Sequence, residues 1–510
     1  MGQTKLTRDK QKPTFRDNSR PLDVHRWSDW PEVNDFVGGI YNDYFKTKHT
    51  KVEREHVKLL LLDLYVNWKE SGAGYLSVHM SPNAYKAKGS RYNKLHISKK
   101  TIDVVNKLEQ LELIEKHTGF FDRATGSGYV TRINPTHHLI SRFLDARFPE
   151  AAIQSDPDQE CIIIHDSAKK PVEYTDSKKI QEMRGNLRSY NDLLKKTHID
   201  CANLEKPVIH RKDGAYVRTG DHNKFVRRIF NNMKCTKGGR FYGGFWQQIP
   251  SEFRQHIRIN GGRTVEVDYS GLHIILLYAR EGFNYWGEVN TDDPYGVDLP
   301  ELDAADARYL AKNLLLMAIN SKDETSTFNA LRSEMNIGGR ITNKLTNELL
   351  KEVLDQLTSK HPIIADKLCS GAGIDLQYID SQMTEKLMMR FTERGIPLLS
   401  VHDSYIVPHQ YALMLRDEMD MAFDGVTKLS EGVEGFFELS AKEGTAIKQI
   451  GYDDEYLRDV DDELSSEERE HDPAMITHKQ VMNEVDKDVH HNHRNRLILF
   501  REYLNSTSNG

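Results

Sequence analysis

The sequence predicts an α+β fold in which helices alternate with short strands and hairpins. Residues 265–278 begin as a strand of alternating apolar and acidic residues and continue as an apolar run too long for one strand. Residues 397–409 are typical of two apolar strands joined by a tight turn. Residues 52–133 indicate two helices followed by a β-hairpin. These patterns together predict helices packed on antiparallel strands in more than one domain.

The size and charge of the chain limit its class. Its 510 residues are enough for two or three domains with sizeable cores. The formal net charge of -6 does not indicate a strongly basic nucleic-acid binder, so any basic surface must be local. Four widely spaced cysteines argue against a zinc ribbon or a disulfide scaffold. Because there is no apolar leader or membrane-length run, we expect a cytoplasmic protein, of a bacterium or a phage-infected cell, that is neither exported nor membrane-bound.

The N-terminal third predicts a basic arm and a DNA-binding domain. Residues 1–51 are rich in charged residues and are expected to form a basic arm and lead-in. Over residues 52–146 the helices and hairpin follow the order of a winged helix–turn–helix. Lys99 and Lys100 would then begin the helix that enters the major groove, and Arg132 on the wing would reach a phosphate. A winged helix used for protein contacts gives the same pattern.

The rest of the chain divides into three segments. Residues 147–200 contain several prolines, a short strand and a helix, which indicates a linker. Residues 201–450 carry most of the candidate functional residues, and basic side chains gather there beside glycines and aromatics in residues 224–243. That composition suits a sugar–phosphate backbone and its bases. Residues 451–510 begin strongly acidic and are expected to form a charged tail that could contact a replication or transcription partner.

Two aspartates on separate predicted elements are the candidate metal ligands. Asp268 ends the strand of residues 265–268, and Asp403 lies in the turn within residues 397–409. Phosphoryl transfer through two metal ions needs carboxylates from separate elements, because the ions clamp the attacking and leaving oxygens together. Hard divalent cations prefer such oxygen ligands. The alternative for Asp268 alone is that it caps the following helix.

A predicted helix between the two aspartates carries two cations on one face. Arg308 and Lys312 are one helical turn apart, and Leu316 and Asn320 extend the same line. Two such cations could neutralise the charge that grows on a leaving pyrophosphate. A solvated helix edge would show the same spacing.

These motifs together resemble those of the family A DNA polymerases and the related single-subunit, phage-type RNA polymerases. The similarity covers residues 230–410 and rests on three motifs: Val267-Asp268-Tyr269-Ser270, Arg308-x-x-x-Lys312 and Val401-His402-Asp403. In the family the first and third motifs bind metal ions, and the second lies on the fingers helix that binds the nucleotide. Gly239-Arg240 also resembles the segment upstream of the first motif, whose arginine contacts the primer–template.

The resemblance implies a polymerase-like right hand. Residues 201–450 would form the palm and fingers, and the helix within residues 147–200 would be a reduced thumb. The implied reaction is template-directed transfer of a nucleotide from a nucleoside triphosphate to a 3′-hydroxyl, with two Mg²⁺ ions or Mn²⁺ in their place. Asp268 and Asp403 would hold the ions, and Lys312 would take part in catalysis.

The resemblance also implies two sets of binding residues. Those expected at the nucleotide are Tyr269, His273, Arg308, Lys312, Leu316 and Asn320. Those expected at the DNA template and primer are Lys237, Arg240, Gln248, Gln377 and His402. Gln382 meets the same description as Gln377, and the spacing does not decide between them.

The chain departs from the family where the sugar and the template base are selected. His273 stands five residues after Asp268, where the DNA polymerases have a glutamate, and Ser404 follows Asp403 as in the phage RNA polymerases. Asn320-Ser321 replaces a Tyr-Gly pair, and no acidic segment indicates a proofreading exonuclease. We expect a family A-like DNA polymerase without proofreading, acting in DNA replication of a mobile element or phage. The alternatives are a primase or single-subunit RNA polymerase, and a DNA-binding replication initiator or regulator with an inactive palm.

Overall fold

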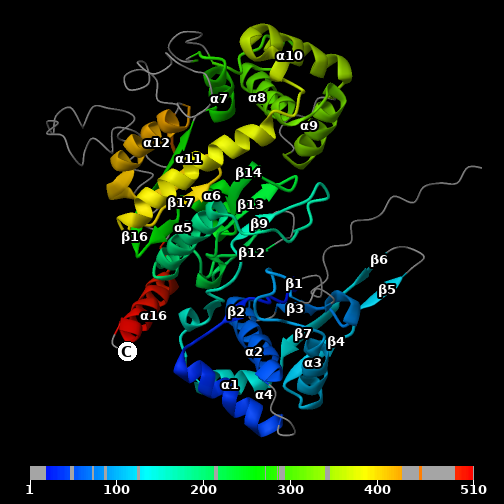
Figure 1. The fold of residues 1–510 in the computed structure, drawn as a ribbon, viewed down its shortest axis with the longest axis vertical. Helices are drawn as coiled ribbons and strands as arrows, with labels where there is room; N and C mark the ends of the chain where they lie inside the picture. Colours follow the sequence, from blue (N-terminus) through cyan, green and yellow to red (C-terminus); the bar gives the residue numbers. More distant parts are fainter. Residues whose placement is uncertain are drawn as a thin grey trace, which may run out of the picture.

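The molecule is a mixture of helices and strands, which confirms the predicted α+β class. The computed structural model describes residues 19–45, 51–71, 74–85, 89–122, 127–146, 148–211, 216–269, 271–283, 285, 293–338, 345–427, 447–450 and 489–508. Figure 1 shows an elongated arrangement, with the N-terminal elements at one end and a helical group at the other. None of the helices in the described part of the chain combines the length and apolar character that a membrane crossing requires.

The N-terminal part packs helices against a four-stranded sheet. Its helices are α1 (Pro31–Tyr44), α2 (Lys51–Ser71), α3 (Lys100–Gln110) and α4 (His137–Ala146). Its sheet has the order β1–β3–β7–β4, with β1 (Ser19–Pro21), β3 (Tyr75–Val78), β7 (Thr131–Pro135) and β4 (Ile114–His117). Helix α2 lies at the centre of the apolar core, because its residues 59–66 are all buried. The continuous apolar run in the sequence predicted this buried helix.

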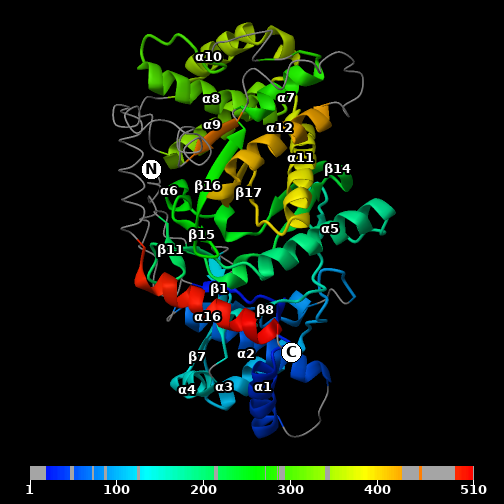
Figure 2. The same ribbon diagram turned by 90° about the vertical axis from the view of Figure 1, so that its left-hand side faces the viewer.

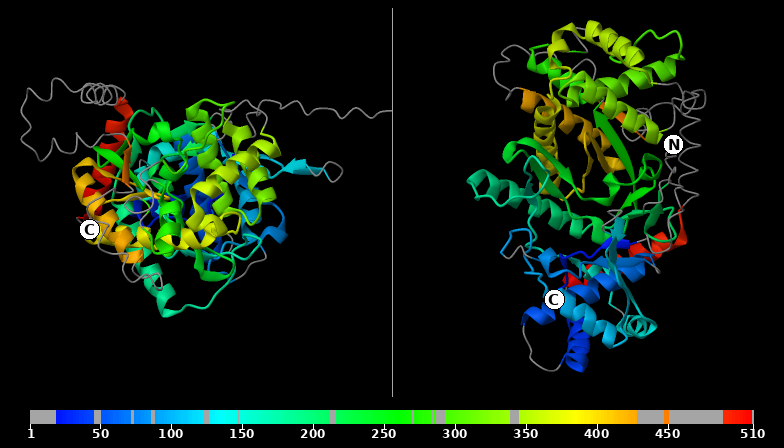
Figure 3. Two further views of the ribbon diagram at one scale, coloured as in Figure 1. Left: turned by 90° about the horizontal axis from the view of Figure 1, so that it is seen from above. Right: turned by 90° about the vertical axis from the view of Figure 1, so that its right-hand side faces the viewer.

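A two-stranded hairpin extends from this part. Strand β5 (Phe120–Asp122) pairs antiparallel with β6 (Ser127–Tyr129), and Figures 1 and 3 show the hairpin projecting away from the body. Phe120 and Phe121 are 53% and 68% exposed. The hairpin that the sequence predicted is the antiparallel pair of β4 with β7, in which Lys116 lies opposite Ile133, and β5 and β6 lie in the connection between these two strands.

The second part is built on a central antiparallel sheet. Its strand order is β10–β15–β16–β18–β17, and β19 also pairs with β16. The strands are β10 (Ile199–Cys201), β15 (Ile257–Ile259), β16 (Gly262–Tyr269), β17 (Leu399–Val401), β18 (Ser404–Pro408) and β19 (Ile447–Ile450). A smaller sheet joins β9 (Ile162–Ile164), β13 (Arg227–Asn231) and β14 (Lys234–Tyr242). The predicted strands around residues 265–269 and 397–409 are both confirmed.

Helices surround this sheet and extend beyond it. Those near the sheet are α5 (Lys178–Lys195), α7 (Leu272–Arg280), α11 (Gly373–Glu393) and α12 (Ala412–Thr427). Those of the group at the far end are α8 (Ala304–Asn320), α9 (Glu324–Gly338) and α10 (Asn347–Lys360). Figure 2 shows α11 running from the sheet toward this group, so it connects the two regions.

The C-terminal helix α16 (His491–Ser508) docks across both parts, as its red ribbon shows in Figure 2. Its Phe500 is buried in the apolar core of the N-terminal part. One helical turn earlier, Arg496 donates from Nε to the Oδ2 atom of Asp200 on β10 at 2.8 Å. The expectation of a charged tail over residues 451–510 did not anticipate this docked helix, and the first part of that segment lies outside the described residues.

Buried ion pairs join α2 to neighbouring segments. The fully buried carboxylate of Asp63 accepts hydrogen bonds from Arg20 at 2.6 and 2.7 Å and from Arg26 at 3.0 Å. Glu70 lies two turns further along α2 and pairs with Arg218 of the second part at 3.2 Å. Burial raises the pKa of Glu70, and the arginines around it counteract this effect. Helix α2 therefore contributes charge pairs as well as apolar surface.

Asp63→Asn should destabilise the protein strongly. The substitution keeps the shape of the side chain but leaves Arg20 and Arg26 without their buried counter-charge, and breaking a buried pair in this way costs about 3–5 kcal/mol. Guanidinium denaturation measures the loss. Asp35→Asn on the exposed face of α1 is the control, with an expected change below about 0.5 kcal/mol. Equally small effects of both substitutions would show that the Asp63 pairs do not stabilise the fold.

Candidate active site

The two candidate aspartates lie next to each other at one end of the central sheet. Strand β16 pairs antiparallel with β18, so that Asp268 lies opposite Ser404. The backbone N–H of Tyr269 donates to the carbonyl oxygen of Asp403 at 3.3 Å. The strand pairing therefore brings together two carboxylates that are 135 residues apart in the chain.

The turn between β17 and β18 holds Asp403 at the end of the sheet. Val401 pairs with Ser404, which leaves only two residues in the turn. His402 adopts a left-handed conformation with φ 59°, which is uncommon for a residue other than glycine. The His402 side chain is exposed and Asp403 is half-buried. His402 therefore shapes the turn from its outer side.

Asp268 does not cap helix α7. The N-cap residue of that helix is Gly271, which has φ 70° and no side-chain hydrogen bond. A Cβ atom added at Gly271 would lie 3.2 Å from the hydroxyl oxygen of Tyr295, so the close approach of this tyrosine also favours glycine. The alternative in which Asp268 serves only as a helix cap does not fit this geometry.

Glu266 lies on the same face of β16 as Asp268, because side chains alternate along a strand. It is 7% exposed. Its Oε2 atom accepts from Nε of Arg254 at 2.8 Å, and its Oε1 atom accepts from the hydroxyl of Ser404 at 2.7 Å. Each carboxylate oxygen of Glu266 is therefore engaged, one by Arg254 and one by Ser404 on β18.

Tyr269 points away from the site, which corrects the expectation that it contacts the nucleotide. Its side chain is 2% exposed, and its hydroxyl donates to the carbonyl oxygen of Met419 on α12. The alternation along β16 puts Tyr269 on the face opposite Asp268. Its role is to pack α12 against the sheet.

The two cations of α8 lie on one exposed face, as the spacing predicted. Arg308, Lys312 and Asn320 are exposed and Leu316 is half-buried, whereas the opposite face of the helix is buried. The side-chain amide of Asn320 donates to the carbonyl oxygen of Leu316 at 2.7 Å. Asn320 is thus held at the end of the helix, and the cations lie nearer its start.

Tyr295, which the sequence analysis missed, links these cations to the aspartates. The centroid of its ring lies 5.2 Å from the guanidinium carbon of Arg308 and 5.8 Å from Nζ of Lys312. Burial raises the pKa of Tyr295 to about 12; Arg308 opposes this shift, while Asp403 and Asp268 add to it. Tyr295 therefore contacts both cations and lies near enough to the two aspartates for their charges to act on its hydroxyl. A single tyrosine in a polar loop gives no sequence signal for such a position.

Arg308 is paired with a carboxylate in this structure. Its Nε and NH2 atoms donate to the two oxygens of Asp293 at 2.8 and 2.9 Å. Both side chains are more than one-third exposed, and exposed pairs contribute about 0–1 kcal/mol. A ligand that carries more negative charge than one carboxylate can therefore replace Asp293. Lys312 has no ion-pair partner among the residues that the structure describes.

Arg240 joins two helices. From β14 its Nε atom donates to Oδ2 of Asp380 on α11 at 2.6 Å, and its NH2 atom donates to Nε2 of His273 on α7 at 3.0 Å. His273 is 9% exposed, and burial together with Arg240 lowers its pKa to about 4. His273 is thus a neutral, fixed side chain five residues after Asp268.

Asp380 is the second residue that the sequence analysis missed. Its side chain is fully buried, and burial raises its pKa to about 7, although Arg240 opposes the shift. The charge of Asp403 raises the pKa further. The Oδ1 atom of Asp380 has no hydrogen-bond partner in the described part of the chain. Only the fold reveals this residue, because an aspartate within a helix is ordinary in sequence.

The other predicted nucleic-acid contacts of the second part differ in exposure. Lys237 pairs with Asp375 on α11. Gln248 is exposed. Gln377 and Gln382 are both half-buried on α11, so their exposure does not choose between them.

The predicted contacts of the N-terminal part also differ. Lys99 and Lys100 are exposed at the start of α3. Arg132 is 7% exposed, and its guanidinium carbon lies 4.7 Å from the centroid of the Tyr129 ring. This burial corrects the expectation that Arg132 lies open to a phosphate. Its strand, β7, runs through the middle of the sheet, where alternate side chains face inward.

The donor atoms near Asp268 and Asp403 suit a hard divalent cation. Both residues offer carboxylate oxygens, the ligands that Mg²⁺ and Mn²⁺ prefer. Among the described residues, no three His, Cys, Asp or Glu side chains gather closely enough to form a metal site by themselves. Mg²⁺ commonly uses one or two carboxylates and takes its other ligands from water and substrate phosphates. Asp268 and Asp403 therefore fit a Mg²⁺ or Mn²⁺ ion.

A scan of protein-family models and a search of curated proteins find no match to this chain. The candidate function therefore rests on the sequence motifs and on the geometry of the site.

The buried Asp380 should make stability depend on pH. An aspartate in an unfolded chain loses its proton near pH 3.9, whereas folded Asp380 loses it near pH 7. Between these values the folded protein binds more protons, so the contribution of Asp380 falls as pH rises through this window. Wild type should lose stability relative to Asp380→Asn from about pH 4 to about pH 7, measured by urea denaturation. A constant difference would contradict the raised pKa.

Proposed function

We propose that this protein is a template-directed nucleotidyltransferase, most similar to a family A DNA polymerase without proofreading. The pairing of β16 with β18 carries the proposal, because it places Asp268 beside Asp403. Arg308 and Lys312 lie over the ring of Tyr295, and the charges of Asp268 and Asp403 also act on that tyrosine. Carboxylates on one side and cations on the other are what a nucleoside triphosphate with divalent ions requires. The three sequence motifs support the same conclusion.

Asp268 and Asp403 would hold two Mg²⁺ ions, or Mn²⁺. When bound, such ions activate the attacking 3′-hydroxyl and stabilise charge on the leaving oxygens. Lys312 and Arg308 bind the outer phosphates, and their charges offset the negative charge that develops as the bond to the α-phosphorus breaks. Lys312 can also donate a proton to the departing pyrophosphate. The exposed pair of Arg308 with Asp293 must open before the triphosphate binds.

His273 is the chain's distinguishing residue at the sugar. In the DNA polymerases of the family a glutamate at this position blocks the ribose 2′-hydroxyl. Here Arg240 fixes a neutral imidazole in its place, with Nε2 occupied by the arginine. A neutral ring excludes the 2′-hydroxyl only by its bulk. A primase or single-subunit RNA polymerase would therefore use the same site and the same reaction, with ribonucleotides as substrates.

We also propose an architecture for this activity. The N-terminal part is a winged helix that binds DNA through Lys99 and Lys100, which are exposed at the start of α3. The central sheet is the palm, the helical group α8–α10 is the fingers, and α5 stands in the place of a reduced thumb. A thumb of one helix holds little of the primer–template, so synthesis would be poorly processive.

A DNA-binding replication initiator or regulator with an inactive palm is the second candidate. The observation that favours it is the bidentate pairing of Arg308 with Asp293, which occupies a cation that the triphosphate needs. An assay of nucleotide incorporation separates the polymerase from the inactive initiator or regulator.

Nucleotide incorporation by the full chain with Mg²⁺ tests the proposal. dNTPs and NTPs are offered separately, on a DNA template with and without a primer. We expect extension of the primer with dNTPs, and a loss of at least about 10³-fold in Asp403→Asn, because a neutral amide cannot replace a charged ligand. Asp417→Asn, an exposed position on α12, is the matched control and should retain activity.

The outcomes distinguish the candidates. Extension that survives Asp403→Asn would overturn the ligand assignment. Incorporation of NTPs without a primer would identify a primase or RNA polymerase. Absence of incorporation by wild type under every condition would favour the initiator or regulator.

A further inference from the structure

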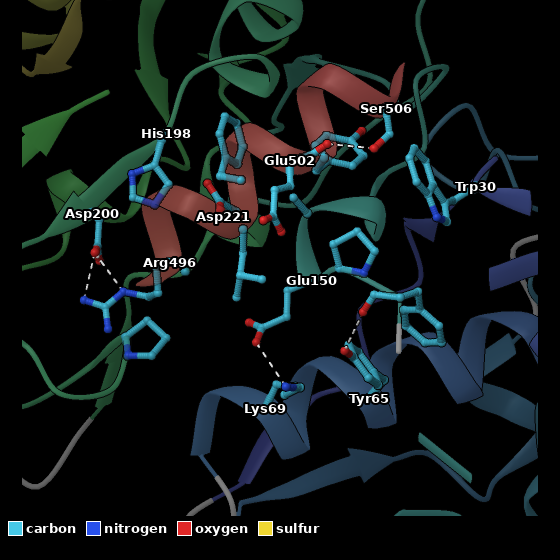
Figure 4. Close-up of a pocket in the computed structure, with 18 of the residues that line it drawn as sticks. Trp30, Tyr65, Lys69, Glu150, His198, Asp200, Asp221, Arg496, Glu502 and Ser506 are labelled. Carbon is cyan, nitrogen blue, oxygen red and sulfur yellow. Dashed lines mark hydrogen bonds and ion pairs between the residues drawn. The ribbon is translucent and has the colours of Figure 1, made fainter. Parts of the chain in front are cut away.

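A cavity of about 490 Å³ lies between the N-terminal part, strand β10 and helix α16 (Figure 4). Most of the charged side chains in its wall already belong to ion pairs. These pairs are Glu150 with Lys69, Asp200 with Arg496, and Asp221 with Lys224. The cavity therefore offers a ligand little unpaired charge. Unpaired cations lie instead on the outer surface, at one end of strands β13 and β14.

A two-residue turn joins β13 to β14, because Asn231 pairs with Lys234. The residues between them, Asn232 and Met233, have φ angles of 54° and 56°. Positive φ at both positions is typical of a type I′ turn, for which Asn-Gly is the favoured sequence. Glycine adopts positive φ without strain, and other residues do not. Met233 therefore occupies the place in this turn where glycine is preferred.

The side chain of Met233 does not offset this strain by packing on the protein, since it is 67% exposed. Residues held in strained backbone conformations concentrate at functional sites. The stability of the fold therefore does not explain a methionine at this position. Contact of its side chain with a partner would explain both the strain and the exposure.

Exposed lysines lie beside Met233 in sequence and in space. Lys234 follows it directly, and Lys169 and Lys170 lie in the turn that follows β9. The backbone N–H of Met233 donates to the carbonyl oxygen of His165 at 2.8 Å, which joins the two turns. We refer to Met233 and these three lysines as the basic tip.

The basic tip keeps a positive charge. Its lysines form no ion pair with any residue that the structure describes. Asp166 is the one acid of the turn after β9, and its Oδ1 atom accepts from the backbone N–H groups of Ala168 and Lys170 at 2.9 Å. One aspartate does not balance three lysines, so the tip attracts an anionic partner.

We infer that the basic tip contacts double-stranded nucleic acid, with its lysines at phosphates and the Met233 side chain inserted between base pairs. Proteins that bind and bend a duplex combine cations for the phosphates with an inserted apolar side chain, for which methionine is suitable. Strand β14 runs from this tip to Arg240, which contacts His273 of the candidate active site. The inference rests on the proposed function, in which the duplex is the primer–template.

Other partners fit the basic tip less well. A protein partner commonly needs a larger surface with an apolar centre, whereas the tip has one apolar side chain among cations. A free nucleotide or phosphate is commonly bound in a concave site, and these lysines lie on protruding turns. Single-stranded nucleic acid is commonly held by aromatic side chains that stack on its bases, and the four residues of the tip include none.

Fluorescence anisotropy of a labelled DNA duplex with the full chain, without nucleotides, tests the inference. Met233→Gly should weaken duplex binding about tenfold, the change expected when one buried apolar contact is lost. The same substitution should leave the melting temperature unchanged or raise it, because glycine suits positive φ. Weakened binding therefore cannot be ascribed to misfolding. Met421→Ala removes another exposed methionine, on α12, and should bind the duplex as wild type does.

Two further measurements separate the phosphate contacts from the inserted side chain. Lys170→Gln and Lys234→Gln should each lower the slope of log affinity against log salt concentration by about one. Lys196→Gln, at the other end of α5, is the control and should keep the slope of wild type. A fluorescent base analogue that brightens when unstacked should respond to wild type and not to Met233→Gly.

Three results would each overturn the inference. They are equal duplex binding by wild type and Met233→Gly, a loss in Met233→Gly that is confined to single-stranded DNA, and competition by polyglutamate as strong as that by unlabelled duplex. The last result would show attraction of any polyanion, an acidic protein included.

The inference and the proposed polymerase can fail separately, because duplex binding is measured without nucleotides. Normal nucleotide incorporation, with undiminished duplex binding by Met233→Gly, would reject the inference alone. Absence of incorporation by wild type, with duplex binding that depends on Met233, would reject the polymerase alone.

Discussion

The antiparallel pairing of β16 with β18 is the constraint on which the site depends. Side chains alternate along a strand, so a slip of one residue would turn Asp268 inward and bring Tyr269 to the site. Two contacts oppose that slip: the Ser404 hydroxyl is bonded to Glu266, and the Tyr269 hydroxyl is bonded to α12. The residues that neighbour Asp268 in sequence therefore fix its position, whether or not they contact a substrate.

The two arginines near the site differ in how firmly they are held. Arg240 is held by buried Asp380 and by His273, so it connects β14, α7 and α11 as one unit. Arg308 is held by Asp293 where both groups are exposed, which makes that pair weak. This difference agrees with the proposed function. In that proposal the palm holds the carboxylates rigidly, and Arg308 on the fingers helix exchanges Asp293 for the triphosphate.

Much of the local structure could be predicted, because periodicity alone determines it. The strand–turn–helix of residues 265–278 and the hairpin of residues 397–409 followed directly from their apolar patterns. Tyr295 and Asp380 could not be found, because their positions depend on contacts between distant segments. Tyr269 was misassigned as a nucleotide contact, since a motif match carries no information about which face of the strand a side chain occupies. The docking of α16 was missed because its few apolar residues lie within a charged segment.

In the proposed reaction, Asp268 and Asp403 share divalent ions with a nucleoside triphosphate. Anomalous diffraction from crystals of the full chain, grown with Mn²⁺ and a non-hydrolysable triphosphate, tests it most directly. We expect manganese peaks in contact with carboxylate oxygens of both aspartates, with the outer phosphates near Arg308 and Lys312. Manganese bound to neither aspartate, or a triphosphate bound away from the manganese ions, would contradict it.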